Sequence, residues 1–241
     1  MALPRFFVDA PVSADTELVL DPHDVRHAAR SLRLKAGEPI LVVRGGEVWQ
    51  AQLVRVSARA VVARALHRTD ENVGELAIEV TILQAVAKGQ KLDDVVEKCV
   101  ELGAARIVPV ICERSYASAG TAKIERWRRI ARSAAEQSRR RTIPIVEAAC
   151  AWADAVGRFP EWRHVLLAYE RAPQHSLRDA LAQLPALESV AIAVGPEGGF
   201  THGEADAAAA AGAKLVSLGP TIVRTETAAA AMLAVIASRY W

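Results

Sequence analysis

Residues 1 to about 70 consist of short apolar runs separated by turn signals. Residues 39–44 form an apolar run, Gly45-Gly46 is a hairpin turn signal, and residues 47–54 alternate polar and apolar positions as a half-buried strand does. A third strand is predicted over residues 59–66, and a short helix over residues 24–32 after an Asp-Pro start signal. This segment is therefore predicted to be a small barrel or sheet, and not a βαβ unit.

The pattern changes after the polar stretch at residues 69–75, where apolar runs begin to alternate with helical periodicity. Strands are predicted over residues 77–85, 106–111, 165–169, 190–194 and 214–218. Helices are predicted over residues 91–102, 122–140, 176–184, 203–211 and 226–240. Strands separated by helices are typical of a parallel α/β sheet. We therefore expect two domains, over residues 1–72 and 73–241.

The composition is that of an ordinary globular protein, with 241 residues, 51% hydrophobic residues and a formal net charge of +2. The three cysteines are far apart and show no C-x-x-C spacing, so we expect neither a disulfide framework nor a metal site. There is no signal-peptide pattern and no uninterrupted apolar run of about 18 residues, the length that favours a membrane span. We expect a cytoplasmic protein with no membrane partner.

Two glycine-bearing loops, at residues 194–200 and 218–227, each follow a short apolar strand. In an open parallel sheet, ligands bind beyond the carboxyl ends of the strands. Gly195 permits a sharp turn, and Gly198-Gly199 lets a ligand approach the backbone. The sequence lacks the dinucleotide fingerprint G-x-G-x-x-G, the P-loop and the H-E-x-x-H and G-x-S-x-G motifs. The residues alone therefore predict a backbone-lined pocket for a small polar ligand, whose identity they do not give. The alternative is that the two loops are tight turns with no binding role.

These two loops carry a resemblance to a known family. Gly195-Pro196-Glu197-Gly198-Gly199-Phe200 and Leu218-Gly219-Pro220-Thr221-Ile222-Val223-Arg224-Thr225-Glu226-Thr227-Ala228 resemble the RsmE family, bacterial SPOUT-superfamily enzymes that methylate N3 of a uridine in 16S ribosomal RNA. Weaker similarity extends over essentially the whole chain, at residues 5–8, 27–37, 98–103, 113–115 and 135–140.

The resemblance implies a SPOUT-type parallel sheet with a C-terminal trefoil knot, preceded by a PUA-like RNA-binding β-barrel. It also implies a homodimer that binds S-adenosylmethionine among three loops, the third near Glu170. The substrate it implies is 16S rRNA, free or in the small ribosomal subunit. The residues expected to bind the cofactor are Gly195, Pro196, Glu197, Gly198, Leu218, Gly219, Ile222, Val223, Glu226, Thr227 and Ala228.

Methylation of an imide nitrogen needs alignment of the reactants, a proton acceptor and donors for the charge that grows on the uracil oxygens. Arg224 is the predicted stabiliser of that charge, and Glu226 is the predicted base or the residue that orients Arg224. The alternatives are an ordinary ion pair for Arg224 and a first-turn helix acid for Glu226. Glu197 is expected either to accept from a ribose hydroxyl or to cap the following helix.

Basic residues gather in two segments, at residues 26–35 and 114–141. A charged helix face is usually only solvated, but the excess of one sign and the suitability of arginine for phosphate favour an RNA footprint. The predicted RNA contacts are Arg5, Arg26, Arg30, Arg33, Lys35, Arg114, Arg129, Arg132, Arg139 and Arg140. The rival hypotheses are another SPOUT RNA methyltransferase with a different target atom and a non-catalytic RNA-binding ribosome-assembly protein.

Overall fold

The computed structural model describes residues 3–70, 74–115, 119–172, 175–184 and 188–241. Contacts within the chain divide it into two units, Met1–Glu75 with Ala135–Thr142, and Leu76–Ala134 with Ile143–Trp241. The domain boundary expected between residues 72 and 73 lies outside the described residues. It remains a prediction.

The N-terminal unit is built on a five-stranded sheet with the order β1-β3-β4-β5-β2. Its strands are β1 (Arg5–Phe7), β2 (Glu17–Val19), β3 (Pro39–Arg44), β4 (Glu47–Val56) and β5 (Val61–Arg68). The predicted strands β3, β4 and β5 are confirmed and pair antiparallel, with register shifts between β4 and β5. The sheet path ends at β1 and β2, so the unit is a curled half-barrel. Three-residue strands such as β1 and β2 are too short for a periodicity argument, and neither was predicted.

The predicted helix of this unit is formed in two parts. It consists of α1 (Pro22–Arg26) and a π-helical turn η1 (His27–Ser31). Asp21 caps α1, because its side chain accepts a hydrogen bond from the His23 backbone N–H at 2.8 Å. The apolar sides of α1 and of the strands share one core, which includes Phe6, Val25, Ile40 and Leu53. The basic residues Arg26 and Arg30 lie on the exposed side of α1 and η1.

Two arginines that were predicted to contact RNA are buried inside this unit. Arg140 is 1% exposed, and its Nη2 donates to Glu75 at 2.6 Å. The same carboxylate accepts from the backbone N–H groups of Arg141 at 2.8 Å and Thr142 at 3.0 Å. Arg5 is 3% exposed and donates to the backbone carbonyls of residues 139 and 140. Arg5 and Arg140 are therefore structural, contrary to the prediction that they face RNA.

The Glu75 carboxylate is held in its ionised form by this arrangement. Burial alone would raise its pKa. The hydrogen bond and the charge of Arg140, with the two backbone N–H groups, outweigh burial and lower the pKa below its ordinary value. The ion pair therefore fastens the segment after the half-barrel to the turn at residues 139–142.

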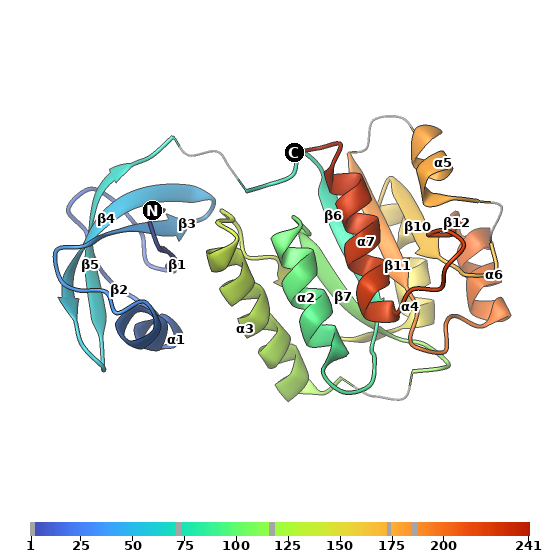
Figure 1. The fold of residues 1–241 in the computed structure, drawn as a ribbon, viewed down its shortest axis with the longest axis horizontal. Coiled ribbons are helices and arrows are strands. Elements are labelled where there is room, and N and C mark those ends of the chain that lie inside the picture. The colour runs from blue at the N-terminus through green and yellow to red at the C-terminus, as the bar shows by residue number, and fades with distance from the viewer. Residues whose placement is uncertain (1–2, 71–73, 116–118, 173–174, 185–187) are drawn as a thin grey trace. The chain divides into compact units, whose positions relative to one another are not determined.

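The C-terminal unit contains a seven-stranded sheet with the path β12-β10-β11-β6-β7-β8, on which β9 also pairs with β7 (Figure 1). Its strands are β6 (Glu79–Ala85), β7 (Arg106–Ile111), β8 (Ile145–Val146), β9 (Cys150–Ala151), β10 (His164–Ala168), β11 (Ser189–Val194) and β12 (Lys214–Val216). Every pairing in this sheet is parallel, which confirms the predicted parallel α/β sheet. β11 and β6 are covered on both faces, and their apolar runs reflect that burial.

The helices of this unit are α2 (Lys91–Glu101), α3 (Thr121–Gln137), α4 (Trp152–Gly157), α5 (Leu177–Ala182), α6 (His202–Ala210) and α7 (Thr225–Ala237), with a 3-10 turn η2 (Phe159–Glu161). The last three residues of α3 group with the N-terminal unit. α2 and α7 lie side by side over one face of the sheet and contact each other (Figure 1). β8, β9, α4 and η2, which span two to six residues each, were not predicted.

The strand order near the C-terminus requires the chain to cross over itself. β10 lies between β11 and β12, so the chain passes over β10 on the way from β11 to β12. It then returns to α7, which packs against β11 and β6. The predicted trefoil knot requires a return of this kind. This crossing brings the segments after β11 and β12 to one edge of the sheet.

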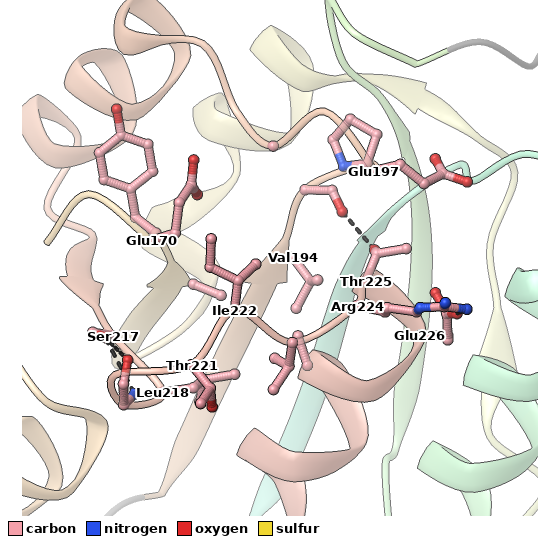
Figure 2. A pocket seen from close by; sticks show the side chains of 18 of the residues that line it. Glu170, Val194, Glu197, Ser217, Leu218, Thr221, Ile222, Arg224, Thr225 and Glu226 are labelled. Carbon is pink, nitrogen blue, oxygen red and sulfur yellow. Dashed lines mark hydrogen bonds and ion pairs between the residues drawn. The ribbon is translucent and has the colours of Figure 1, made fainter. Parts of the chain in front are cut away.

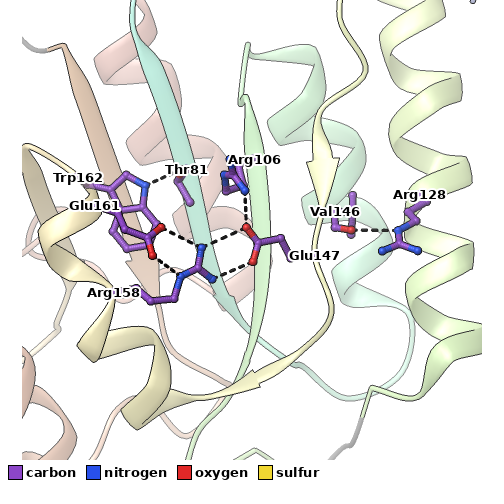
Figure 3. Close-up of polar contacts among 8 residues, drawn as sticks. All are labelled: Thr81, Arg106, Arg128, Val146, Glu147, Arg158, Glu161 and Trp162. Atoms are coloured by element: carbon purple, nitrogen blue, oxygen red, sulfur yellow. Dashed lines mark hydrogen bonds and ion pairs between the residues drawn. The ribbon is translucent and has the colours of Figure 1, made fainter.

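An ion-pair network fastens α4 and η2 near the amino-terminal edge of this sheet (Figure 3). Glu147 accepts from Arg158 at 2.8 Å and from Arg106, and Arg158 also pairs with Glu161 at 2.9 Å. Burial alone would raise the pKa of Glu147, but the hydrogen bonds from Arg158 and Arg106 lower it. The network steadies the segment that carries Trp152, whose ring lies 4.6 Å from that of Phe200.

Candidate active site

Three strand ends meet at the carboxyl edge of the sheet and enclose a pocket (Figure 2). The parallel register places the ends of β10, β11 and β12 next to one another, with Leu167 opposite Ala193 and Ala168 opposite Val216. The segments that leave these strands line a cavity of about 610 Å³ together with the start of α7. The two glycine-bearing loops are therefore brought together, as the sequence predicted for strands of one parallel sheet.

The first loop, at residues 194–200, contains a tight turn in which a side chain at position 195 or 199 would be crowded. A side-chain carbon on Gly195 would lie 3.0 Å from the backbone nitrogen of Phe200. The Gly199 N–H donates to the Pro196 carbonyl at 2.9 Å and closes the turn. Gly199 has a φ of +67°, and a side chain there would also lie 3.2 Å from the Glu170 carboxylate. The loop thus keeps its backbone open toward the cavity.

Glu197 in this loop is tied to the start of α2. Its Oε1 accepts from the Lys88 backbone N–H at 3.0 Å and from the Lys91 Nζ at 2.9 Å. Burial alone would raise the pKa of Glu197, but the hydrogen bonds from Lys91 and Lys88 lower it. The next helix, α6, is capped instead by Thr201, in a reciprocal capping box with Glu204. Of the two predicted roles for Glu197, capping that helix is excluded.

The second loop, at residues 217–224, folds over the other side of the cavity. The Ser217 hydroxyl donates to the Gly219 carbonyl at 3.1 Å and accepts from the Gly219 N–H at 3.2 Å. Gly219 has a φ of +131°, a conformation that other residues rarely adopt. Ile222 is 85% exposed at the outer part of the loop. Such an exposed apolar side chain beside a cavity is suited to cover a bound ligand.

Arg224 and Glu226 lie together where this loop enters α7 (Figure 2). The Arg224 side chain is 83% exposed, and its Nη1 lies 3.9 Å from Oε1 of Glu226. This long, solvent-exposed contact is a weak ion pair, which leaves the guanidinium available to a ligand. Oε2 of Glu226 is buried without a hydrogen-bond partner. A buried carboxylate oxygen without a donor is costly, and a donor from a ligand would satisfy it.

The structure can be compared residue by residue with the predicted cofactor set. The members that line the pocket are Gly195, Pro196, Glu197, Gly198, Leu218, Gly219, Ile222, Val223, Glu226 and Ala228. Thr227 is exposed and does not line it. The prediction omitted Lys91 and Thr225, which do line the pocket, and Gln84, which is buried behind it. A weak signal for Gln84 existed, since it is a polar residue between the apolar residues Leu83 and Ala85 of β6.

The remaining basic residues occupy exposed positions in each unit. Arg26, Arg30, Arg33 and Lys35 are exposed on α1–η1 and the turn after it. Arg129 is exposed on α3, Arg132 is half-buried there, and Arg139 is exposed beyond the end of α3. The Nη1 of Arg114 donates to the Gly198 carbonyl at 2.7 Å, so this exposed arginine rests on the first pocket loop.

Within the described residues, no group of three or more histidine, cysteine, aspartate or glutamate side chains is placed to hold a metal ion. Among the helices so described, none has the length and apolar character needed to cross a membrane.

Comparison with known proteins places this architecture in a family. Residues 74–237 match the family model of the RNA methyltransferase domain, and residues 20–66 match that of the RNA methyltransferase PUA domain. The ribosomal RNA small subunit methyltransferase E of Synechocystis is 34% identical, over 97% of this chain and 75% of its own length. That of Mycobacterium tuberculosis is 32% identical, over 96% of this chain and 90% of its own length.

Solved structures agree with the sequence relatives. The crystal structure of ribosomal RNA small subunit methyltransferase E from Neisseria gonorrhoeae, bound to S-adenosylmethionine, matches with a TM-score of 0.90 and 31% identity, over 99% of this chain and 98% of that one. A structure from Legionella pneumophila in complex with the same cofactor also matches with a TM-score of 0.90, at 29% identity and the same coverage. The chain has the SPOUT fold with an N-terminal PUA-like unit, and it belongs to the RsmE family, the ribosomal RNA small subunit methyltransferases E.

Proposed function

We propose that this protein transfers a methyl group from S-adenosylmethionine to N3 of a uridine in 16S ribosomal RNA. The observation that carries the proposal is the pocket formed by the two loops and the start of α7. It lies in a chain whose fold matches, over nearly its full length, a family member crystallised with S-adenosylmethionine.

The pocket has the size and chemistry for this cofactor. Its volume of about 610 Å³ falls within the range of small-molecule sites, roughly 300–1,000 Å³. Three carboxylates, Glu170, Glu197 and Glu226, line it, and these suit ribose hydroxyls and a positively charged ligand. Backbone groups of the first loop and of residues 218–219 would hold adenine and ribose, and Ile222, Val223 and Ala228 would supply apolar contact. Oε1 of Glu197 is engaged by Lys91, which leaves Oε2 for a ribose hydroxyl.

The residues at the start of α7 supply what the target base needs. S-adenosylmethionine, when bound, supplies an electrophilic methyl group. The uridine N3 must lose its proton, and the negative charge then spreads to the uracil oxygens. The exposed Arg224 guanidinium would stabilise that charge. Glu226 would accept the proton or hold Arg224 in position, and its unpartnered Oε2 supports a role toward a ligand.

The exposed basic residues would bind the RNA backbone. Residues 26–35 in the N-terminal unit, with Arg129, Arg132 and Arg139, carry the charge that phosphate contacts require. Arg114 would link RNA to the pocket, because it already rests on Gly198. Such contacts position the RNA, and sequence is read elsewhere. The proposal extends to a homodimer that acts in the cytoplasm on 16S rRNA or on the small ribosomal subunit.

The function is tested by mapping modified nucleosides in 16S rRNA from cells with and without this protein. We expect one 3-methyluridine to disappear from the RNA of cells that lack it. An unchanged set of methyluridines would contradict the proposal. A methyl group lost from another atom would point to another SPOUT RNA methyltransferase. The absence of any binding heat with S-adenosylmethionine, even with RNA present, would favour a non-catalytic assembly protein.

Replacing Gly199 by alanine is expected to weaken cofactor binding about tenfold. A side chain at a φ of +67° is strained by about 1–2 kcal/mol, and relief of this backbone strain would shift the first loop. A shift that costs about 1.4 kcal/mol raises Kd tenfold. Calorimetric titration with S-adenosylmethionine measures the change.

Gly212→Ala provides the matched control for this prediction. Gly212 has a φ of +99° in the turn between α6 and β12, away from the pocket and with open space around its position. The control carries similar backbone strain and is expected to keep the wild-type Kd. Equal Kd values for wild type and Gly199→Ala would show that the first loop does not hold the cofactor.

A further inference from the structure

A buried chain of hydrogen bonds links the central strand β6 to the start of α7 and to the first pocket loop. Thr225, the first residue of α7, is 7% exposed, and its hydroxyl lies 2.6 Å from the Gly195 carbonyl (Figure 2). The amide nitrogen of Gln84, a fully buried residue of β6, lies 2.9 Å from the same hydroxyl. Neither residue is a candidate to touch the methyl group or the target base.

The direction of each bond in this chain follows from the chemistry of the groups. A carbonyl oxygen only accepts, so the single hydroxyl proton of Thr225 is committed to Gly195. Gln84 must therefore donate to Thr225, and its Nε2 also donates to the Ala85 carbonyl at 3.1 Å. If the Gln84 amide were rotated by half a turn, its oxygen would face two acceptors, the Ala85 carbonyl and the Thr225 hydroxyl oxygen. The hydroxyl is thus not free to take a proton from a substrate, and its role is to hold the backbone.

Apart from the long Arg224–Glu226 contact, no other side-chain bond holds the start of α7 within the described parts of the chain. The N-cap residue is Arg224, whose side chain makes no capping hydrogen bond, although helices usually begin with a residue that does. The first loop, in contrast, has anchors of its own, in the Gly199 to Pro196 turn bond and the Glu197 to Lys91 pair. Loss of the Thr225 hydroxyl would therefore loosen the start of α7 more than it loosens the first loop.

Arg224 and Glu226 flank Thr225 directly in the chain. Because successive helical residues point about 100° apart, fixing Thr225 inward fixes where its two neighbours point. The Gln84 amide oxygen is buried without a hydrogen-bond partner, a costly arrangement that a purely structural apolar residue would avoid. The polar residue at this position is explained if its donors are needed to orient Thr225.

We propose that Thr225 and Gln84 are positioning residues for methyl transfer, which set Arg224 and Glu226 against the first pocket loop through the Gly195 carbonyl. The inference rests on the proposed function and adds two residues to it. Thr225 and Gln84 would thus orient the start of α7 for the reaction, whereas other pocket residues would bind the cofactor.

The test compares Thr225→Val, which keeps the shape and removes the hydroxyl, with Thr225→Ser, which keeps the hydroxyl. We expect Thr225→Val to lower kcat for 3-methyluridine formation at least about tenfold, while the Kd for S-adenosylmethionine, measured by calorimetry, changes less than about threefold. Thr225→Ser is expected to keep kcat within about threefold. Met232→Ala, a buried change further along α7, controls for loss of stability and is expected to keep kcat at temperatures where it stays folded.

Coupling between the two residues gives a second readout. Gln84→Leu combined with Thr225→Val is expected to lower kcat no further than the more damaging single change, because both remove the same chain of bonds. Full kcat in Thr225→Val, an equal loss in Met232→Ala, or losses that multiply in the double variant would overturn the inference. Wild-type protein that forms no 3-methyluridine would instead contradict the proposed function, so the two failures are distinguishable.

Discussion

Replacing Arg224 by alanine is expected to lower kcat for methyl transfer about 100- to 1,000-fold, the usual cost of removing one donor to a developing oxyanion. The guanidinium is 83% exposed and makes only a long contact with Glu226, so the loss would fall on catalysis and not on stability. The Kd for S-adenosylmethionine is expected to stay within about threefold. Single-turnover transfer to 16S rRNA measures kcat, and calorimetry measures Kd.

The controls separate the charge of Arg224 from its geometry. Arg163→Ala removes another exposed arginine, before β10, and is expected to leave kcat unchanged. Arg224→Lys keeps the charge but loses the planar fork, so partial activity is expected. Wild-type kcat in Arg224→Ala would mean that this arginine takes no part in the reaction.

Glu226→Gln in the same assay distinguishes the two proposed roles of Glu226. If the carboxylate is the base, the amide cannot accept the N3 proton and the variant loses most of the rate. If it only orients Arg224, the amide still accepts a hydrogen bond from the guanidinium and keeps part of the rate.

Replacing Glu75 by alanine is expected to destabilise the N-terminal unit by about 3–5 kcal/mol, the cost of leaving a buried charge without its partner. The Arg140 side chain is 2% exposed, and the backbone N–H groups of Arg141 and Thr142 also donate to the Glu75 carboxylate. Thermal unfolding followed by circular dichroism should show the midpoint lowered by about 10 °C, at about 2–4 °C per kcal/mol.

An exposed pair in the same unit is the control for Glu75. Glu17 and Arg64 lie 2.7 Å apart with about half of each side chain exposed, so Glu17→Ala should cost no more than about 1 kcal/mol. The pKa of Glu75 is lowered in the folded protein, so its contribution is present above the unfolded pKa and is lost as pH falls through the folded value. The wild type should therefore lose stability below about pH 4.5 more steeply than Glu75→Ala. Equal effects of the two substitutions would contradict the buried-pair account.

Much of the fold could be predicted from hydrophobic periodicity, because long elements repeat their pattern often enough to be recognised. β3 and β7 have the predicted bounds, and the five predicted helices of the C-terminal unit are present within a few residues. β8 and β9 could not be predicted, since two residues carry no period. The strand order could not be predicted either, because it depends on which apolar faces meet in space.

Site residues could be predicted where the backbone conformation requires a glycine. They were harder to predict where the role of a side chain depends on whether it is buried. Gly199 and Gly219 indicated loops in the sequence because glycine readily adopts a positive φ, and both residues do so in the structure. Arg140 was misjudged because its neighbours in sequence are basic, while the carboxylate that neutralises it lies 65 residues away. Thr227 follows the pocket residues in sequence, yet it is exposed outside the pocket. Charge in a sequence therefore identifies a basic segment without telling which of its arginines are free.

The central claim is that this pocket delivers a methyl group to N3 of a 16S rRNA uridine. The most direct measurement incubates the purified protein with small ribosomal subunits from cells that lack it and with S-adenosylmethionine carrying a deuterated methyl group, followed by mass analysis of the nucleosides. We predict one labelled 3-methyluridine per 16S rRNA, strongly reduced in Arg224→Ala. Label in no nucleoside, or in a nucleoside other than 3-methyluridine, would contradict the claim.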